Sequence, residues 1–129
     1  MYPYQRLIVW QRAHALTVSF YDSGAFNESL RYRALVVQLR RCAGSVAANI
    51  AEGAASESQA SFARYLGIAL ASAHELEGHV LLARDIGCSS RAASDRFAEE
   101  TESIKRMLTV LQRTVKSRRS RERKTDGSP

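Results

Sequence analysis

The sequence contains few residues that break helices or cross-link chains. Only 2 prolines and 7 glycines occur in 129 residues, too few for a fold built from many strands and tight turns. The 2 cysteines, Cys42 and Cys88, are too few and too far apart for a disulfide framework or a clustered zinc site. We therefore expect both thiols to be reduced. At 129 residues the chain is also long enough to fold around a hydrophobic core of its own.

Long apolar runs are also missing. No stretch reaches the roughly 18 uninterrupted apolar residues that a membrane-spanning helix needs. The opening segment, MYPYQRLIVW, lacks the basic region, apolar core and small-residue cleavage site of a signal peptide. These absences predict a cytoplasmic protein without a membrane segment.

Motifs of catalysis are not found either. The chain has no Gly-x-Ser-x-Gly elbow and no glycine-rich phosphate loop. His74 and His79 are spaced by five residues, which places their rings about 140° apart around a helix and excludes a shared ion. Cys42 lies among apolar residues with no base placed beside it, so we interpret it as a small core residue. We predict no enzyme, no bound metal and no cofactor; an active site formed between subunits is the remaining catalytic hypothesis.

The net charge of +6 is concentrated near the carboxyl end. From residue 116 onward six basic and two acidic side chains contribute +4, while the preceding 115 residues contribute 13 basic and 11 acidic groups, or +2. Residues 117–129 contain no large apolar side chain and cannot bury enough surface to offset the entropy of ordering. We therefore expect a bundle domain over residues 1–116 and a disordered basic tail over residues 117–129.

Apolar residues recur at three- and four-residue steps in four segments, which is the pattern of amphipathic helices. These segments span residues 7–22, 27 or 29 to 53, 56–87, and 89 or 90 to 116. Ser56 and Gln59 have the spacing of a capping box at the start of the third segment. Four such helices with short connections predict an all-α fold, an antiparallel up-down-up-down four-helix bundle.

The single tryptophan lies on the apolar stripe of the first segment. That stripe consists of Leu7, Trp10, Ala13, Thr17 and Phe20. Because Trp10 shares the stripe with apolar residues and not with charged ones, we predict that it is buried beside the second or third helix.

Several apolar residues of the first and third segments lie outside the apolar stripes of their helices, and these residues predict an oligomer. A monomer would expose them to water, and a contiguous apolar set along one helix is typical of an interface between subunits. The predicted interface residues are Tyr65, Ile68, Leu81, Leu82, Ile8 and Val9.

A line of polar residues follows the second segment. Arg41, Ser45, Asn49 and Glu52 are spaced by four, four and three residues, and Glu75 of the third segment joins them in a candidate polar network. The line is either a solvated face with ordinary ion pairs or a buried hydrogen-bonded network between closely packed helices. The spacing leaves both interpretations open.

Several segments together resemble a known family. LIVWQRA at 7–13, QLRRCAGS at 38–45, NIAEG at 49–53, FARYLGIA at 62–69 and LARDIG at 82–87 are similar, in order and spacing, to four-helix-bundle proteins encoded in intervening sequences of large-subunit ribosomal RNA genes. The resemblance implies a homopentamer with a central channel and no enzymatic activity. It extends distantly to accessory proteins of diversity-generating retroelements, which implies nucleic acid as a partner. The chain departs from the family pattern at Cys42 and at Gly44. It also departs over residues 54–57, where the family often has a basic residue.

Two functional hypotheses follow. In the first, the protein is a non-enzymatic oligomeric scaffold that binds RNA or a ribonucleoprotein partner through phosphate contacts. The residues expected to make these contacts are Arg118, Arg119, Arg121, Arg123 and Lys124. In the second, the protein is a protein–protein interaction module without a nucleic-acid role, and the tail only aids solubility.

Overall fold

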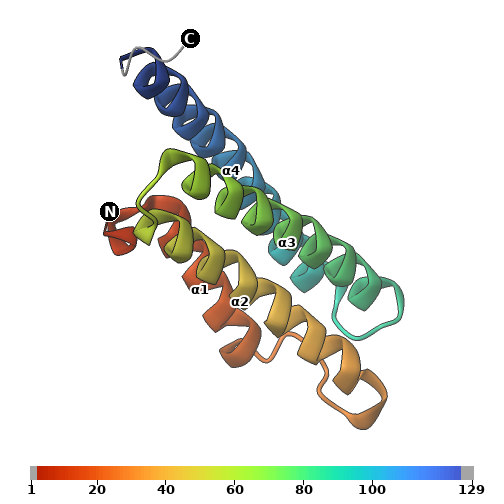
Figure 1. Cartoon of the computed structure of the whole chain (residues 1–129). Helices are drawn as coiled ribbons and strands as arrows, with labels where there is room; N and C mark the ends of the chain where they lie inside the picture. The colour runs from red at the N-terminus through yellow and green to blue at the C-terminus, as the bar shows by residue number, and fades with distance from the viewer. Residues whose placement is uncertain (1–2, 126–129) are drawn as a thin grey trace.

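The computed structural model describes residues 3–125, and side-chain surroundings are described as far as residue 123. Its elements are a short 3-10 helix at Tyr4–Arg6, α1 (Ile8–Asp22), a second 3-10 helix at Leu30–Tyr32, α2 (Arg33–Ala55), α3 (Gln59–Asp85) and α4 (Arg91–Thr125). Each α-helix packs against the next along the chain, and α1 also contacts α4 (Figure 1). This arrangement confirms the predicted all-α up-down bundle.

The turns between helices carry the residues that their backbone requires. Gly24 and Gly87 have φ angles of +67° and +81°, a left-handed conformation that glycine adopts without a steric penalty. Ser58 caps α3, because its hydroxyl accepts a hydrogen bond from the Ser61 amide at 3.1 Å. Ser56 instead ends α2, where its hydroxyl donates to the Gly53 carbonyl. The N-cap of α3 is therefore Ser58, two residues after Ser56, where the capping box was predicted.

One continuous apolar core runs between the four helices. Its central side chains are completely buried and come from α2, α3 and α4: Leu39, Ile50, Leu66, Leu76, Ile104 and Leu108. At one end, the rings of Phe20, Phe26 and Phe97 lie 4.6–5.2 Å apart by centroid. This aromatic cluster joins α1, the following loop and α4 at the end of the bundle where the α1–α2 and α3–α4 connections meet.

The core face of α1 is rotated from the predicted stripe. Its buried residues are Val9, Ala13, Leu16 and Phe20. Trp10 is only half-buried, at the edge of the core, where its ring meets Tyr4 and His14 at centroid distances of 5.0 and 4.8 Å. The prediction of a buried tryptophan is therefore wrong. The predicted and observed stripes both have helical spacing and share two residues, so the pattern alone did not determine the phase.

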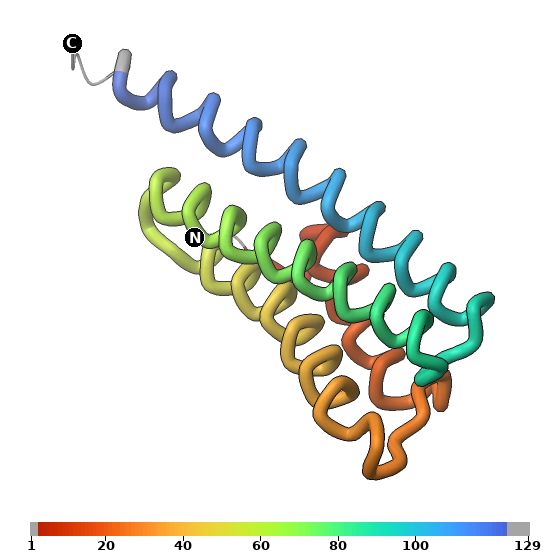
Figure 2. Tube along the Cα trace, turned by 90° about the vertical axis from the view of Figure 1, so that its right-hand side faces the viewer, coloured from red at the N-terminus to blue at the C-terminus, as the bar shows by residue number. Residues whose placement is uncertain are grey.

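α4 continues through Thr125, which contradicts the predicted disorder over residues 117–125. Residues 126–129 lie outside the described part of the chain. The last turns of α4 project beyond the ends of the other helices (Figure 1, Figure 2), and the side chains from Lys116 to Arg123 are exposed. Arg, Lys and Glu are good helix formers, and extending a helix already nucleated by packing costs little. Helix formation here therefore needs no buried apolar surface.

Within residues 3–125, none of the helices combines the length and the apolar run required to cross a bilayer.

Candidate functional sites on the α4 arm and the α2–α3 seam

The projecting end of α4, residues 116–125, is here called the basic arm. Four of the five predicted phosphate-binding residues, Arg118, Arg119, Arg121 and Arg123, are exposed on it. The fifth, Lys124, is part of the helix, and its side-chain surroundings lie outside the described residues. Successive residues are rotated by about 100°, so the four arginines cover more than half of the helix circumference. The arm therefore presents positive charge in several directions at once.

The base of the basic arm lies beside the turn between α2 and α3. Arg118 lines a shallow cavity there with Ala54, Glu57 and Phe62, among others. The remaining arginines follow Arg118 along the arm, and the last turns of α4 extend away from the bundle (Figure 2). The structure thus separates Arg118, which borders the bundle, from Arg119, Arg121 and Arg123.

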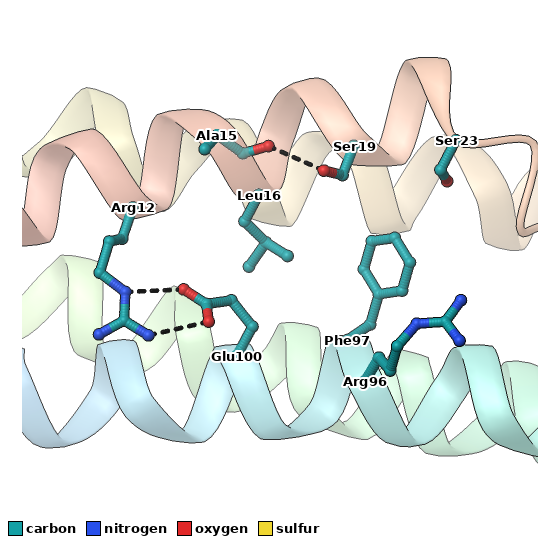
Figure 3. Close-up of a pocket in the computed structure, with 8 residues that line it drawn as sticks. All are labelled: Arg12, Ala15, Leu16, Ser19, Ser23, Arg96, Phe97 and Glu100. Atoms are coloured by element: carbon teal, nitrogen blue, oxygen red, sulfur yellow. Dashed lines mark hydrogen bonds and ion pairs between the residues drawn. The ribbon is translucent and has the colours of Figure 1, made fainter.

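A second surface feature is a groove between α1 and α4 (Figure 3). Arg12 and Glu100 form a bidentate ion pair across it, with N–O distances of 2.9 and 2.8 Å. The hydrogen bonds that Arg12 donates to the Glu100 carboxylate raise the pKa of its guanidinium. Leu16 and Phe97 form part of the lining next to this pair. The ion pair joins two helices that are distant in sequence, so we interpret it as a structural contact.

The seam between α2 and α3 holds part of the predicted polar network. The hydroxyl oxygens of Ser45 on α2 and Ser72 on α3 are 2.9 Å apart. The Asn49 amide donates to the carbonyl and hydroxyl oxygens of Ser45 at 2.8 and 3.1 Å. These groups are partly buried, so the seam is neither the solvated face nor the fully buried network that the sequence left open.

The charged members of the predicted network are more exposed. Arg41 lies 3.6 Å from the Glu75 carboxylate across the seam and donates two hydrogen bonds to the Gln38 side chain. Glu52 is exposed, and in the part of the chain that the structure describes it joins none of these bonds. The structure therefore brings together Arg41 with Glu75 and Ser45 with Asn49, as two adjacent pairs.

A set of side chains that the sequence analysis missed lies further along this seam. The ligand-type atoms of Cys42, Glu75 and His79 are all within 4.8 Å of one another. Burial, together with the neighbouring Glu75 carboxylate, raises the pKa of the Cys42 thiol to about 11. Cys42 is buried in the core, as predicted, but the expectation that no base lies beside it is wrong. Which residues of α3 face Cys42 depends on the packing register of the helices, which the sequence pattern does not contain.

One part of the signal was nevertheless present in the sequence. Glu75 and His79 are four residues apart and so share one face of α3. His74, which drew attention as a possible partner of His79, instead lies on the α3–α4 side of the helix beside Lys105 and Val110. His74 and His79 therefore face different sides of α3, whereas Glu75 and His79 share one.

Comparison with known proteins gives the chain a family. Residues 5–110 match the model of the 23S rRNA-intervening sequence protein family. The chain belongs to this family. The resemblance seen in the sequence is thereby confirmed, although the match says nothing of the distant similarity to retroelement accessory proteins.

A solved structure supports the same fold for this 23S rRNA-intervening sequence protein. It is the crystal structure of a protein of unknown function from the S23 ribosomal protein family of Bacteroides thetaiotaomicron, with a TM-score of 0.75 and 23% sequence identity. The similarity covers 81% of this chain and 98% of the other. No match is found among curated proteins. The α2–α3 seam lies inside the family match, and the basic arm lies beyond its last residue.

Proposed function

We propose that this family member is a non-enzymatic, cytoplasmic scaffold that assembles into a homo-oligomer and binds RNA through its basic arm. The observation that carries the proposal is the exposed helical arm with arginines at 118, 119, 121 and 123, projecting past the bundle. The description of the family, which refers to intervening sequences of 23S rRNA, supports RNA as the nucleic acid.

The arm suits contact with a phosphate backbone. Its ten residues extend about 15 Å at 1.5 Å per residue, which is long enough to lie along several phosphates. Arginine forms bidentate hydrogen bonds to phosphate oxygens. Such contacts fix position but read no sequence, and each one makes the affinity fall with rising salt. We therefore expect weakly sequence-specific binding that depends strongly on ionic strength.

Oligomer formation is supported by apolar side chains on two diagonal helices. Ile68, Leu81 and Leu82 on α3 and Ile8 on α1 are exposed, as predicted. Among the described elements, α1 and α3 each contact α2 and α4 but not one another, so they lie diagonally across the bundle. Their outer surfaces face different ways, as a closed ring with head-to-tail interfaces requires. A pentamer is the form that the family resemblance implies.

Two of the six predicted interface residues, Val9 and Tyr65, are less exposed than the other four. Val9 is buried in the core of its own subunit, with 4% of its surface exposed, so its expected exposure is wrong. It occupies the position on the α1 core face that the predicted stripe gave to Trp10. Tyr65 is partly buried, with Arg64 over its ring. The proposed interface therefore consists mainly of Ile8, Ile68, Leu81 and Leu82.

An oligomer would also bring several arms to one RNA. Each additional arm that reaches the same strand binds at a high effective concentration, which increases overall affinity without new contacts. The alternative function is a protein–protein interaction module, favoured by the same exposed apolar side chains on α1 and α3. That alternative requires no affinity for RNA.

RNA binding is tested with two charge-matched variants. In the arm variant, Arg118, Arg119, Arg121 and Arg123 are replaced by Gln. In the control variant, Gln replaces four exposed arginines of the bundle: Arg6, Arg33, Arg91 and Arg96. Filter binding to unrelated RNAs over a salt series should show a loss of about tenfold or more at low salt for the arm variant only. Absence of binding at low salt, or equal losses in both variants, would contradict the proposal and favour the interaction module.

A further inference from the structure

We propose that Cys42, Glu75 and His79 form a binding site for a divalent transition-metal ion, with Zn²⁺ as the best match. Thiolate, imidazole and carboxylate are the three ligand types that zinc takes in proteins. The set differs from the basic arm in place and in charge, so the inference does not depend on RNA binding. It also replaces the expectation of no metal site, which considered the cysteines and the histidines separately and not a cysteine with a histidine and a carboxylate.

The two helices place these side chains on one small part of the seam. Glu75 and His79 are one turn apart on α3, and the Nε2 atom of His79 is 3.6 Å from the Glu75 carboxylate. Cys42 faces them from α2, and all three ligand atoms lie within 4.8 Å of one another. Atoms bound at 2.0–2.3 Å to a tetrahedral zinc ion are about 3.4 to 3.6 Å apart. Small rotations of the Glu75 and His79 side chains therefore bring the three atoms to coordinating distance.

The imidazole of His79 supplies the observation that points to a ligand. Its Nε2 atom is shielded from solvent and has no hydrogen-bond partner within the described structure. At 3.6 Å the contact with Glu75 is too long for a hydrogen bond. A buried polar atom without a partner is unfavourable, and a coordinated ion would satisfy this nitrogen directly.

The different exposures of the ligands suit an ion that enters from solvent. Cys42 is held in the core with 1% of its surface exposed, whereas the Glu75 side chain is half exposed. The buried thiol gives a fixed ligand, and the carboxylate is free to close over the ion. Zinc sites with three protein ligands take a water or another molecule in the fourth position. Coordination requires the Cys42 thiolate, so the thiol proton passes to solvent as the ion binds.

Arg41 forms the rim of the proposed site. Its guanidinium lies 3.6 Å from the Glu75 carboxylate and donates to Gln38. A neighbour of this kind orients a carboxylate ligand while opposing the approach of a cation. The ion would join α2 to α3 at the middle of an outward α3 face that carries Ile68 on one side and Leu82 on the other.

Cobalt replaces zinc in tetrahedral sites and reports its ligands in the absorption spectrum. We expect the reduced protein to bind one Co²⁺ per chain, with visible bands of a tetrahedral ion and a near-ultraviolet thiolate-to-cobalt band. Zn²⁺ should displace the cobalt and bleach both. Cys42→Ala should remove the thiolate band, and His79→Gln should weaken binding by about a hundredfold or more.

Two controls and a second readout keep the test decisive. Two control variants should leave the cobalt spectrum unchanged. Cys88→Ala removes the other thiol, and His74→Gln removes the imidazole that is next to Glu75 in the sequence. Zn²⁺ should raise the melting temperature of the wild type but not that of His79→Gln, whose partly exposed side chain is not needed for folding. The proposal is overturned if the reduced wild type gives no thiolate band, if the band survives Cys42→Ala, or if His79→Gln binds cobalt as tightly as the wild type.

Discussion

Gly53 lies where α2 packs closely against α3. A Cβ atom at this position would lie 2.9 Å from Cδ1 of Phe62, which is shorter than real contacts of this kind. It would also lie 3.0 Å from Cβ of Tyr65, which is tighter than nine in ten such contacts. Gly44, on the same helix, has open space in the corresponding direction. The two glycines therefore have different roles: one permits the packing of two helices, and the other only lacks a side chain.

Substitution by alanine should separate these roles. Gly53→Ala should lower the free energy of unfolding by about 1 to 3 kcal/mol, because the new methyl group displaces packed neighbours. Gly44→Ala should raise it by about 0.5 to 1 kcal/mol, because alanine is the better helix former. Urea denaturation of both variants measures the difference, and equal effects would show that Gly53 is not a packing constraint.

Lys105 of α4 contacts one carboxylate on α3, that of Glu77, and one on its own helix, that of Glu102. Its ammonium group lies 3.2 Å from Glu77 and 3.1 Å from Glu102. The hydrogen bond from Lys105, together with its positive charge, lowers the pKa of Glu102 from its usual value of 4.5. A lowered pKa in the folded state means that Glu102 stabilises the protein above its usual pKa and loses this contribution as the pH falls through the lowered value.

Glu102→Gln should therefore change the pH dependence of stability. The wild type should have the higher melting temperature near neutral pH, and the two should converge as the pH falls below 4.5, where Glu102 takes up its proton. Thermal unfolding over a pH series measures this convergence. A difference that stays constant with pH would show that the Lys105 contact makes no electrostatic contribution.

Single residues show where sequence reasoning reached its limit. The buried position of Cys42 followed from its apolar neighbours in the sequence, and the structure confirms it. Its proximity to Glu75 and His79 depends on contacts between residues more than thirty positions apart. Such contacts follow from the register of α2 against α3, and an amphipathic pattern on each helix does not determine that register.

The helices themselves were the most predictable elements, because each has a strong apolar period and a turn residue at its end. α1 is the exception in its orientation, since two stripes of helical spacing overlap in its sequence and only packing selects between them. α4 is the exception in its length, because it continues further than predicted. The absence of apolar residues predicts disorder, whereas charged residues with high helix propensity continue the helix past the bundle.

The basic arm should be separable from the stability of the bundle. Arg118 borders the α2–α3 turn, and the described side chains that follow it are exposed. We expect removal of residues 119–129 to reduce the helical circular dichroism signal slightly and to leave the melting temperature within a few degrees, about the effect of 1 kcal/mol or less. A large fall in melting temperature would show that the arm packs against the bundle or against another subunit.

At the scale of the whole molecule, the exposed apolar side chains are the feature that one bundle leaves unexplained. Ile8 and Leu82 are 58% and 47% exposed and lie on diagonal helices, so a single planar contact does not cover both. Replacement of Leu82 by Arg adds a charge to the proposed interface without touching the core. This variant should dissociate the assembly while its circular dichroism remains that of a helical bundle.

Light scattering of the purified protein at micromolar concentration tests the assembly most directly. We predict one species heavier than the 14.3 kDa chain, at about five times that mass if the family resemblance extends to the pentamer, and a shift toward the monomer for Leu82→Arg. A stable 14.3 kDa monomer for the wild type would contradict the oligomeric scaffold and leave Ile8, Ile68, Leu81 and Leu82 facing water.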